Sequence, residues 1–290
     1  MKLYAPSTIK GIKEKYGFRL TKSLGQNFLT DKNIIDRIIE GSGITEEDLV
    51  IEIGPGIGVI TYEASLAARR VIAVEIDRNL IPILEETLAE RENIQVINSD
   101  ILKTDVNRII EDARKKDPKI KGVKIIGNLP YYITTPIIMK LLEEGVKADG
   151  ITAMMQKEVA DRIKAAPGTK AYGALSVAVQ YYCEIESVVN VPKEVFVPQP
   201  KVDSAGVLNL KIRKTWPVET RDRELFFAVV KAGFGQRRKT LSNSLMGVKD
   251  ITKEIVFESL NAAGIEPSRR AETLSLEEFA QLSNQVALRL

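Results

Sequence analysis

The chain has 290 residues, of which 44% are hydrophobic, and its 42 basic and 39 acidic residues give a formal net charge of +3. This length accommodates one large domain and a small one. The chain contains no histidine, which excludes Ser–His and Cys–His catalysis and histidine metal ligands. Any chemistry must therefore use amides, carboxylates, hydroxyls, the backbone or a cofactor.

The cysteine content and the apolar pattern bear on location. Cys183 is the single cysteine, so the chain can form no internal disulfide and no cysteine-based zinc site. No apolar run is long enough for a transmembrane helix, and the N-terminus lacks the apolar segment of a signal peptide. We therefore expect a cytoplasmic protein with no membrane partner and no metal.

Residues 1–26 are predicted to form a basic N-terminal arm. Its basic residues face a single acid, Glu14, and they are Lys2, Lys10, Lys13, Lys15, Arg19 and Lys22. One interpretation is a solvated, frayed terminus; the other is an arm that contacts RNA phosphates, with Lys22 as an RNA-binding candidate. The Gly-Gln-Asn-Phe stretch 25–28 follows and is too polar to predict a strand, whereas Asp31 is placed to cap a helix with an apolar face.

A strand, a glycine-rich turn and a helix come next. Leu49–Ile53 reads as a buried strand, Gly54–Gly58 as the turn, and residues 59–68 as an alanine-rich helix. This order is typical of a dinucleotide-type site. A second strand, 71–74, ends in Glu75, roughly 20 residues after the first glycine, where an acid meets ribose hydroxyls. The alternative for Glu75 is an acid at a helix N-terminus that the macrodipole favours.

The third strand and the glycine pattern narrow the type of ligand. Strand 94–97 leads to Asp100, which is placed either to accept from an adenine amine or to cap the next helix. The turn lacks the third glycine of pyrophosphate-binding sites, because Ile60 and Thr61 occupy that region, and this argues against NAD. S-adenosylmethionine has no phosphate and tolerates such a turn.

The fourth predicted strand carries the most informative chemistry. Val123–Ile126 is followed by Gly127, where the backbone can turn sharply or be approached closely, and then by Asn128-Leu129-Pro130-Tyr131. Ligands bind beyond the carboxyl ends of such strands. The Asn128 side-chain oxygen and the Leu129 carbonyl can both accept from the amine of a nucleobase, Pro130 stiffens the turn, and Tyr131 offers a face for an extruded base. The alternative is a plain turn with a half-buried tyrosine.

The remaining pattern predicts more alternating elements and then only helices. The expected elements are a helix at 135–142, a strand at 151–155, a charged helix start at 156–162, a loop at 165–170, a helix at 172–182, a strand at 186–191 and a closing edge-hairpin strand at 205–212. Beyond residue 213 only helices are expected, at 222–233, 239–246, 252–263 and 275–288. We therefore predict a sheet domain over 27–212 and a small helical domain over 213–290.

Two further segments are binding candidates. In the stretch 195–204 two prolines fix an extended loop, which either holds Phe196 as the second face of a base sandwich opposite Tyr131 or buries it as a hydrophobic plug. The glycine-hinged turn 233–239 carries Arg237, Arg238 and Lys239, which suit RNA phosphates or form a solvated interhelical loop.

The motifs together resemble one family along essentially the whole chain. They are Gly25-Gln26-Asn27-Phe28-Leu29, Glu52-Ile53-Gly54-Pro55-Gly56, Glu75-Ile76-Asp77, Asn128-Leu129-Pro130-Tyr131 and Phe196-x-Pro198-x-Pro200-Lys201-Val202-x-Ser204. In this order they resemble the bacterial small-subunit ribosomal RNA adenine N6-dimethyltransferases. The resemblance implies a class I S-adenosylmethionine-dependent methyltransferase fold, α/β and Rossmann-like, with a seven-stranded sheet whose last strand is antiparallel, plus a small all-helical C-terminal domain.

The same resemblance implies an activity and a set of site residues. The family uses S-adenosylmethionine to dimethylate N6 of two adjacent adenosines in the 3′-terminal hairpin loop of small-subunit rRNA. The cofactor would be contacted by Asn27, Leu29, Gly54, Gly56, Glu75, Asp100 and Asn128. Glu75 would take the ribose hydroxyls and Asp100 the adenine amine. The target adenine would be held by Asn128, Leu129, Pro130 and Tyr131, with Phe196 opposite.

Partners and competing functions follow from the resemblance as well. The expected partners are the small ribosomal subunit and its rRNA, and we expect a monomer. The nearest alternative is the sister family that dimethylates large-subunit rRNA and confers macrolide resistance; Leu129 and the Phe196-to-Ser204 motif favour the small-subunit type. An alternative of another class is an RNA-binding assembly factor in which methylation is secondary.

Overall fold

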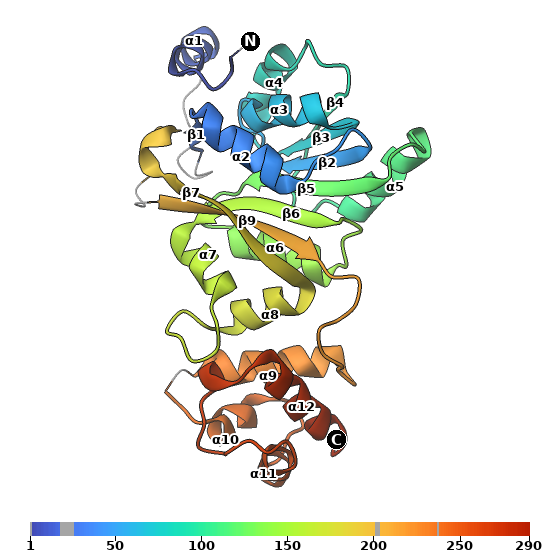
Figure 1. Ribbon diagram of the computed structural model, residues 1–290, viewed down its shortest axis with the longest axis vertical. Coiled ribbons are helices and arrows are strands. Elements are labelled where there is room, and N and C mark those ends of the chain that lie inside the picture. Colours follow the sequence, from blue (N-terminus) through green and yellow to red (C-terminus); the bar gives the residue numbers. More distant parts are fainter. Residues whose placement is uncertain (1, 18–25, 201–203, 237) are drawn as a thin grey trace. The chain divides into compact units, whose positions relative to one another are not determined.

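A computed structural model describes residues 2–17, 26–200, 204–236 and 238–290 (Figure 1). Contacts between residues divide the chain into two compact units. The first comprises the residues up to Ala160 together with Glu184–Ile212, and the second comprises Asp161–Cys183 and Arg213–Leu290. The first unit ends at Ile212, where the sequence predicts the end of the sheet domain, but residues 161–183 group with the C-terminal helices instead. The division into domains at 26 and 212 stays a prediction.

The first unit contains the strands and the helices that flank them. Its strands are β1 (Phe28–Leu29), β2 (Asp48–Ile53), β3 (Arg70–Glu75), β4 (Ile94–Asn98), β5 (Gly122–Asn128), β6 (Gly150–Gln156), most of β7 (Cys183–Pro192), β8 (Phe196–Val197) and β9 (Ser204–Ile212). Its helical segments are α1 (Pro6–Tyr16), α2 (Lys32–Ser42), α3 (Val59–Ala67), η2 (Arg78–Leu80), α4 (Ile81–Thr87), α5 (Val106–Lys116), α6 (Thr134–Glu143) and η3 (Lys193–Val195), and α7 (Lys157–Lys164) begins in it.

The main sheet has seven strands in the order β4-β3-β2-β5-β6-β9-β7. Strands β4, β3, β2, β5 and β6 pair in parallel, and β9 runs antiparallel to β6 with Met154 opposite Val207. This confirms the predicted seven-stranded sheet with an antiparallel last strand. The outermost strand on this side of the sheet is β7. Strand β9, which corresponds to the predicted closing strand, lies between β6 and β7.

The position of β2 determines where a ligand can bind. Strand order reverses here, because β3 lies on one side of β2 and β5 on the other. All six residues of β2 are buried, which explains its nearly continuous apolar sequence. At such a switch point the loops after the strands diverge to opposite faces and leave a crevice at the carboxyl ends.

The described part of the N-terminal arm is not frayed. Pro6 lies in the first turn of α1, where proline is favoured, and Ile9 and Ile12 are buried. Lys15 and Tyr16 both donate to the Glu86 carboxylate of α4, with Lys15 Nζ 2.6 Å from Glu86 Oε2. The frayed-terminus interpretation is therefore wrong for residues 6–16. Lys22 lies outside the described residues.

A second, two-stranded sheet corrects another expectation. Phe28 and Leu29 form β1, which pairs antiparallel with β8. The polar composition of residues 25–28 did not predict this strand, because Phe28 is the only residue of that stretch that belongs to it. Both side chains are buried, so the pairing anchors the chain directly after Asn27.

The second unit is helical. It contains the end of α7, α8 (Ala174–Tyr182), α9 (Arg223–Gly235), α10 (Leu241–Ser244), η4 (Leu245–Gly247), α11 (Lys253–Ala262), η5 (Ala271–Thr273) and α12 (Leu276–Ala287). The residues 161–183 belong here because Tyr181 packs on Phe226 of α9 and stacks on Trp216, with ring centroids 5.1 and 5.3 Å apart. Aromatic pairs of this kind contribute stability beyond their buried area.

Among the described residues no helix has the length and apolar character needed to cross a membrane. In the same part of the chain no group of three or more aspartate, glutamate, histidine or cysteine side chains could hold a metal ion.

Gly127 is a position in β5 where the backbone of β2 leaves no room for a side chain. A Cβ atom at this position would lie 2.8 Å from the Ile53 carbonyl oxygen and 3.1 Å from Leu129 Cδ2. We expect Gly127→Ala to lower the free energy of unfolding by about 1–3 kcal/mol, because the backbone must move. Gly11→Ala in α1 is the control, since a Cβ there would meet nothing within 4 Å. Urea denaturation of both variants measures this, and equal stabilities would contradict the close approach.

Candidate active site

A cavity lies at the carboxyl ends of β2, β3, β4 and β5, inside the first unit. Its lining includes Asn27, Leu29, Glu52, Gly54, Gly56, Glu75, Ile76, Ser99, Asp100, Asn128, Pro130 and Tyr132. Every cofactor-contacting residue predicted from the sequence is in this set. The structure thus brings together residues that are far apart in the sequence, such as Asn27 and Asn128, which are 101 positions apart.

The glycine turn after β2 forms one wall of the cavity. Gly54 and Gly56 have φ values of +69° and +62°, which side chains disfavour. A Cβ on Gly56 would lie 2.9 Å from Cε1 of Phe28, so glycine is needed for space as well as for backbone conformation. The backbone nitrogen of Gly54 donates to the Val74 carbonyl of β3 at 3.0 Å, which fixes the turn against the neighbouring strand.

Glu75 ends β3 with its carboxylate in the cavity wall. It is only 4% exposed; Oε1 accepts from the Asp77 nitrogen at 2.8 Å and Oε2 from the Gly56 nitrogen at 3.4 Å. Burial raises the pKa of Glu75 to about 7, although these backbone donors act in the opposite direction. The side chain that caps the short helix η2 is that of Asp77 and not that of Glu75, and the ribose-binding role of Glu75 stays a prediction.

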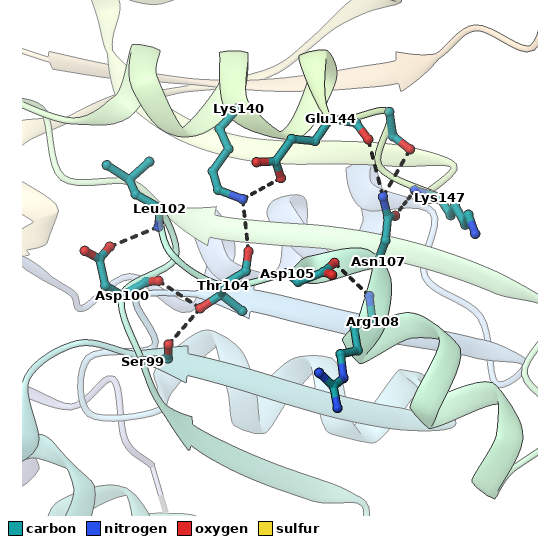
Figure 2. Close-up of polar contacts among 11 residues, drawn as sticks. Ser99, Asp100, Leu102, Thr104, Asp105, Asn107, Arg108, Lys140, Glu144 and Lys147 are labelled. Atoms are coloured by element: carbon teal, nitrogen blue, oxygen red, sulfur yellow. Dashed lines mark hydrogen bonds and ion pairs between the residues drawn. The ribbon is translucent and has the colours of Figure 1, made fainter.

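Asp100 follows β4 on the same rim. Its Oδ1 accepts from the Leu102 nitrogen at 2.9 Å (Figure 2), which holds the loop in an Asx-type turn. The next helix, α5, is capped by Asp105, whose side chain accepts from the Arg108 nitrogen. Helix capping is therefore not the role of Asp100, and its carboxylate lines the cavity.

The orientation of the Asn128 side chain is set by one hydrogen bond. Its Nδ2 donates to the backbone carbonyl of Asn27 at 2.9 Å. Because an amide has its donor and its acceptor on opposite branches, this bond commits Oδ1 to the other direction. Asn128 lines the cavity, and the role of its oxygen as an acceptor stays a prediction.

The rest of the turn is rigid. Leu129 is buried, and its nitrogen donates to the Met154 carbonyl of β6 at 3.1 Å. The bonds that close the turn go to the Pro130 carbonyl, from the Ile133 nitrogen and from Thr134 Oγ1, both at 3.0 Å. The turn's own bonds thus use the carbonyl of Pro130 and not that of Leu129.

The aromatic residues are placed differently from the expected base sandwich. Tyr131 is half-buried, and burial raises the pKa of its phenol. Phe196 is 1% exposed and belongs to the hydrophobic core with Phe28 and Leu29, because pairing of β8 with β1 directs it inward. The structure thus places Phe196 as the hydrophobic plug. The residue that sequence reasoning missed is Tyr132, which is 59% exposed and lines the cavity.

Glu52 is a second residue that sequence reasoning did not assign. It lies within β2, is 1% exposed and lines the cavity. Its Oε2 and Oγ1 of neighbouring Thr61 are buried without a hydrogen bond of good geometry, although the Thr61 hydroxyl is near enough to lower the pKa of the carboxyl, against the effect of burial. Burial raises the pKa of Glu52 to about 8. A carboxylate inside the apolar run Leu49–Ile53 was the available signal, since a buried group of this kind is costly unless it is paired.

The RNA-binding candidates of the C-terminal turn belong to the second unit. Arg238 and Lys239 are exposed, and the Lys239 nitrogen donates to the Gln236 carbonyl at 2.9 Å. Arg237 lies outside the described residues. Their exposure is compatible with either predicted role, RNA contact or a solvated loop.

Comparison with known proteins gives consistent matches. The family described as ribosomal RNA adenine dimethylase matches residues 17–288. The chain is 53% identical over 289 residues to ribosomal RNA small subunit methyltransferase A of Alkaliphilus metalliredigens, covering 99% of both chains. It is 52% identical to the protein of the same name in Clostridioides difficile, over 98% of this chain and 96% of that one.

Two solved structures share the fold. A dimethyladenosine transferase from Plasmodium falciparum superposes with a TM-score of 0.72 at 24% identity, covering 88% of this chain and 95% of that one. The 23S rRNA methyltransferase ErmE superposes with a TM-score of 0.67 at 27% identity, covering 90% of this chain and 99% of that one.

The raised pKa of Glu75 predicts a pH-dependent affinity. Only the ionised carboxylate can accept from both hydroxyls of a ribose, and a pKa of about 7 leaves most of the group protonated at pH 6. We expect the affinity for S-adenosylhomocysteine to be about tenfold weaker at pH 6 than at pH 8, measured by calorimetry. Glu75→Gln should bind weakly with a smaller pH dependence, whereas Glu52→Gln should retain the part that comes from Glu75. An affinity that is constant between pH 6 and pH 8 would contradict the assignment.

Proposed function

Because the chain belongs to the ribosomal RNA adenine dimethylase family, we propose that it transfers methyl groups from S-adenosylmethionine to N6 of two adjacent adenosines in the 3′-terminal hairpin loop of small-subunit rRNA. The product is N6-dimethyladenosine, formed during assembly of the small subunit. The observation that carries the proposal is the amide of Asn128, which a hydrogen bond to the Asn27 carbonyl orients in the wall of the cavity.

The residues around the cavity fit the cofactor. S-adenosylmethionine supplies a methyl group on a positively charged sulfur. Glu75 accepts from the ribose hydroxyls, and Asp100 accepts from the adenine amine. Glu52 offers an unpaired, buried carboxylate oxygen to a positively charged part of the ligand. Gly56 leaves room that a side chain would fill, since a Cβ atom at this position would lie 2.9 Å from the Phe28 ring.

Asn128 and Leu129 act on the target amine. The lone pair of an adenine N6 is delocalised into the ring, so the amine is a poor nucleophile until its nitrogen becomes pyramidal. Two acceptors, Asn128 Oδ1 and the Leu129 carbonyl, favour that geometry. They need no reorganisation at the moment of reaction, because the bond to Asn27 and the rigid turn already hold them.

The proton released from the methylated amine needs no dedicated base. The ammonium that attack produces is strongly acidic, so water can take the proton, which agrees with a chain that contains no histidine. Base stacking rests on Tyr131, which keeps part of its ring exposed next to the cavity-lining Pro130 and Tyr132, whereas Phe196 is buried. The main contribution of the chain is alignment of the two reactants, an effect worth several kcal/mol.

Sequence identity favours a small-subunit rRNA substrate over a large-subunit rRNA substrate. The chain is 52–53% identical to small subunit methyltransferases A over nearly its whole length. It is 27% identical to the 23S rRNA methyltransferase ErmE. This difference supports a small-subunit substrate. In keeping with that substrate, we place the protein in the cytoplasm and expect it to act as a monomer on the assembling small subunit.

Substitution of Asn128 tests the acceptor role. We expect Asn128→Ala to lower kcat by about 100- to 1,000-fold, while the affinity for S-adenosylhomocysteine changes much less. Asn209→Ala is the matched control: the Asn209 amide also donates to a backbone carbonyl, that of Gly41 at 3.0 Å, but it does not line the cavity. Single-turnover transfer and calorimetry separate the two effects. Equal losses of turnover and of cofactor affinity would refute the acceptor role.

The substrate is tested with labelled S-adenosylmethionine and small ribosomal subunits from a strain that lacks its own dimethyltransferase. Large subunits and naked RNA are run in parallel. We expect label in N6-dimethyladenosine of the small-subunit RNA only. Label in large-subunit RNA would move the protein to the resistance type, and no transfer with cofactor still bound would favour an RNA-binding assembly factor.

A further inference from the structure

The loop between β4 and α5, residues 99–105, forms the adenine side of the cavity. Ser99 and Asp100 line the cavity, and the strand bond from the Ser99 nitrogen to the Glu75 carbonyl, at 3.0 Å, fixes where the loop begins. Beyond that point the loop leaves the sheet. Two backbone bonds close it locally, from the Lys103 nitrogen to the Asp100 carbonyl at 2.9 Å and from the Thr104 nitrogen to the Ile101 carbonyl at 3.3 Å, and side chains supply its remaining bonds.

Thr104 closes the loop from within. Its Oγ1 donates to the Asp100 carbonyl at 2.8 Å and lies 2.8 Å from the Ser99 hydroxyl (Figure 2). A hydroxyl has a single proton, and a carbonyl can only accept. The Ser99 hydroxyl must therefore be the donor to Thr104, and both cavity-lining residues are tied to one hydroxyl.

Lys140 fixes this loop from outside. It is on α6, and its side chain is only 14% exposed. Its Nζ donates to the Thr104 carbonyl at 2.9 Å and to Glu144 Oε2 at 2.5 Å, as Figure 2 shows. An ammonium held by one carboxylate and one carbonyl is a directed cross-link rather than a solvated surface charge.

Helix α6 is the element that follows the Asn128–Tyr131 turn. Its first turn is bonded to that turn through Thr134 Oγ1 and the Pro130 carbonyl at 3.0 Å. The same helix therefore holds the Asn128–Tyr131 turn at its beginning and, through Lys140, the loop 99–105 on another side of the cavity. A second tie lies nearby, where Asn107 Oδ1 accepts from the Lys147 nitrogen at 2.8 Å.

We propose that Lys140 is a positioning residue that holds the Asp100 loop against α6, so that the Asp100 carboxylate meets the adenine amine of the cofactor. The inference rests on the proposed use of S-adenosylmethionine. Lys140 touches neither ligand; it acts through Thr104. Its removal should therefore reduce recognition of the adenine amine, more than it reduces binding as a whole.

The test compares S-adenosylhomocysteine with S-inosylhomocysteine, in which a carbonyl replaces the adenine amine. We expect the wild-type protein to bind the adenosyl ligand at least about tenfold more tightly, because the carboxylate loses its donor and meets a carbonyl oxygen. In Lys140→Met, which keeps a similar chain length without the charge, we expect this ratio to fall to about threefold or less. Calorimetry measures both affinities, and thermal unfolding checks that the variant is folded.

Three further variants sharpen the test. Lys147→Met removes an exposed ammonium, paired with Glu111 at 2.7 Å, and should leave the ratio unchanged. Lys140→Arg retains a donor and should preserve most of the ratio. Thr104→Val removes the inner hydroxyl and should lower the ratio as Lys140→Met does, which keeps the test available if Lys140→Met fails to fold.

The outcomes separate this inference from the proposed function. A wild-type protein that binds neither ligand would overturn the use of S-adenosylmethionine. A wild-type protein that discriminates, with a folded Lys140→Met variant that discriminates equally, would overturn the positioning role alone. Equal weakening of both ligands in Lys140→Met would likewise show that Lys140 stabilises the fold without positioning Asp100.

Discussion

The site depends on the meeting of parallel strand ends beside β2. Every cofactor candidate except those near Asn27 lies at the end of one of four neighbouring parallel strands, or in the loop directly after it. The backbone of that edge is held by the sheet, so the side chains that leave it start from fixed points. Gly127 shows how tight the arrangement is, since a Cβ there would reach the Ile53 carbonyl at 2.8 Å. The pairing of β2 with β5 on one side and with β3 on the other is what brings Asn128 to the same cavity as Glu75.

Much of this arrangement could be predicted from the sequence because it follows from local rules. Apolar strands, a glycine turn and acids at strand ends indicate a nucleoside site, and the structure places Glu75, Asp100 and Asn128 around one cavity. The parts that failed depend on tertiary pairing. Residues 28 and 29 form a strand only because residues 196 and 197 lie beside them. A local sequence pattern cannot predict a pairing partner so distant in the sequence. The same pairing buries Phe196.

The sequence could not show which of two neighbouring acidic residues caps a helix. Asp100 and Asp105 both precede α5, and only the observed bond from the Arg108 nitrogen to Asp105 identifies the cap. Likewise, Glu75 and Asp77 both precede η2, and the cap is Asp77. In each pair the residue nearer the helix accepts from a backbone nitrogen of the first helical turn, whereas the residue nearer the strand lines the cavity. Proximity to the strand end is thus the better guide to a ligand role than acidity alone.

The two buried carboxylates of the cavity are costly to ionise in the absence of a ligand. Glu52 and Glu75 are nearly inaccessible, and burial raises the pKa of Glu52 to about 8 and that of Glu75 to about 7. A buried carboxylate with a raised pKa opposes folding when it ionises, so the folded state becomes less favoured as pH rises from the ordinary range of a glutamate through these values. A ligand that brings hydroxyl donors and positive charge removes this penalty, because it pairs with the ionised forms. The site therefore retains groups whose ionisation destabilises the empty protein, and under the proposed function Glu52 would favour a positively charged nucleoside over a neutral one.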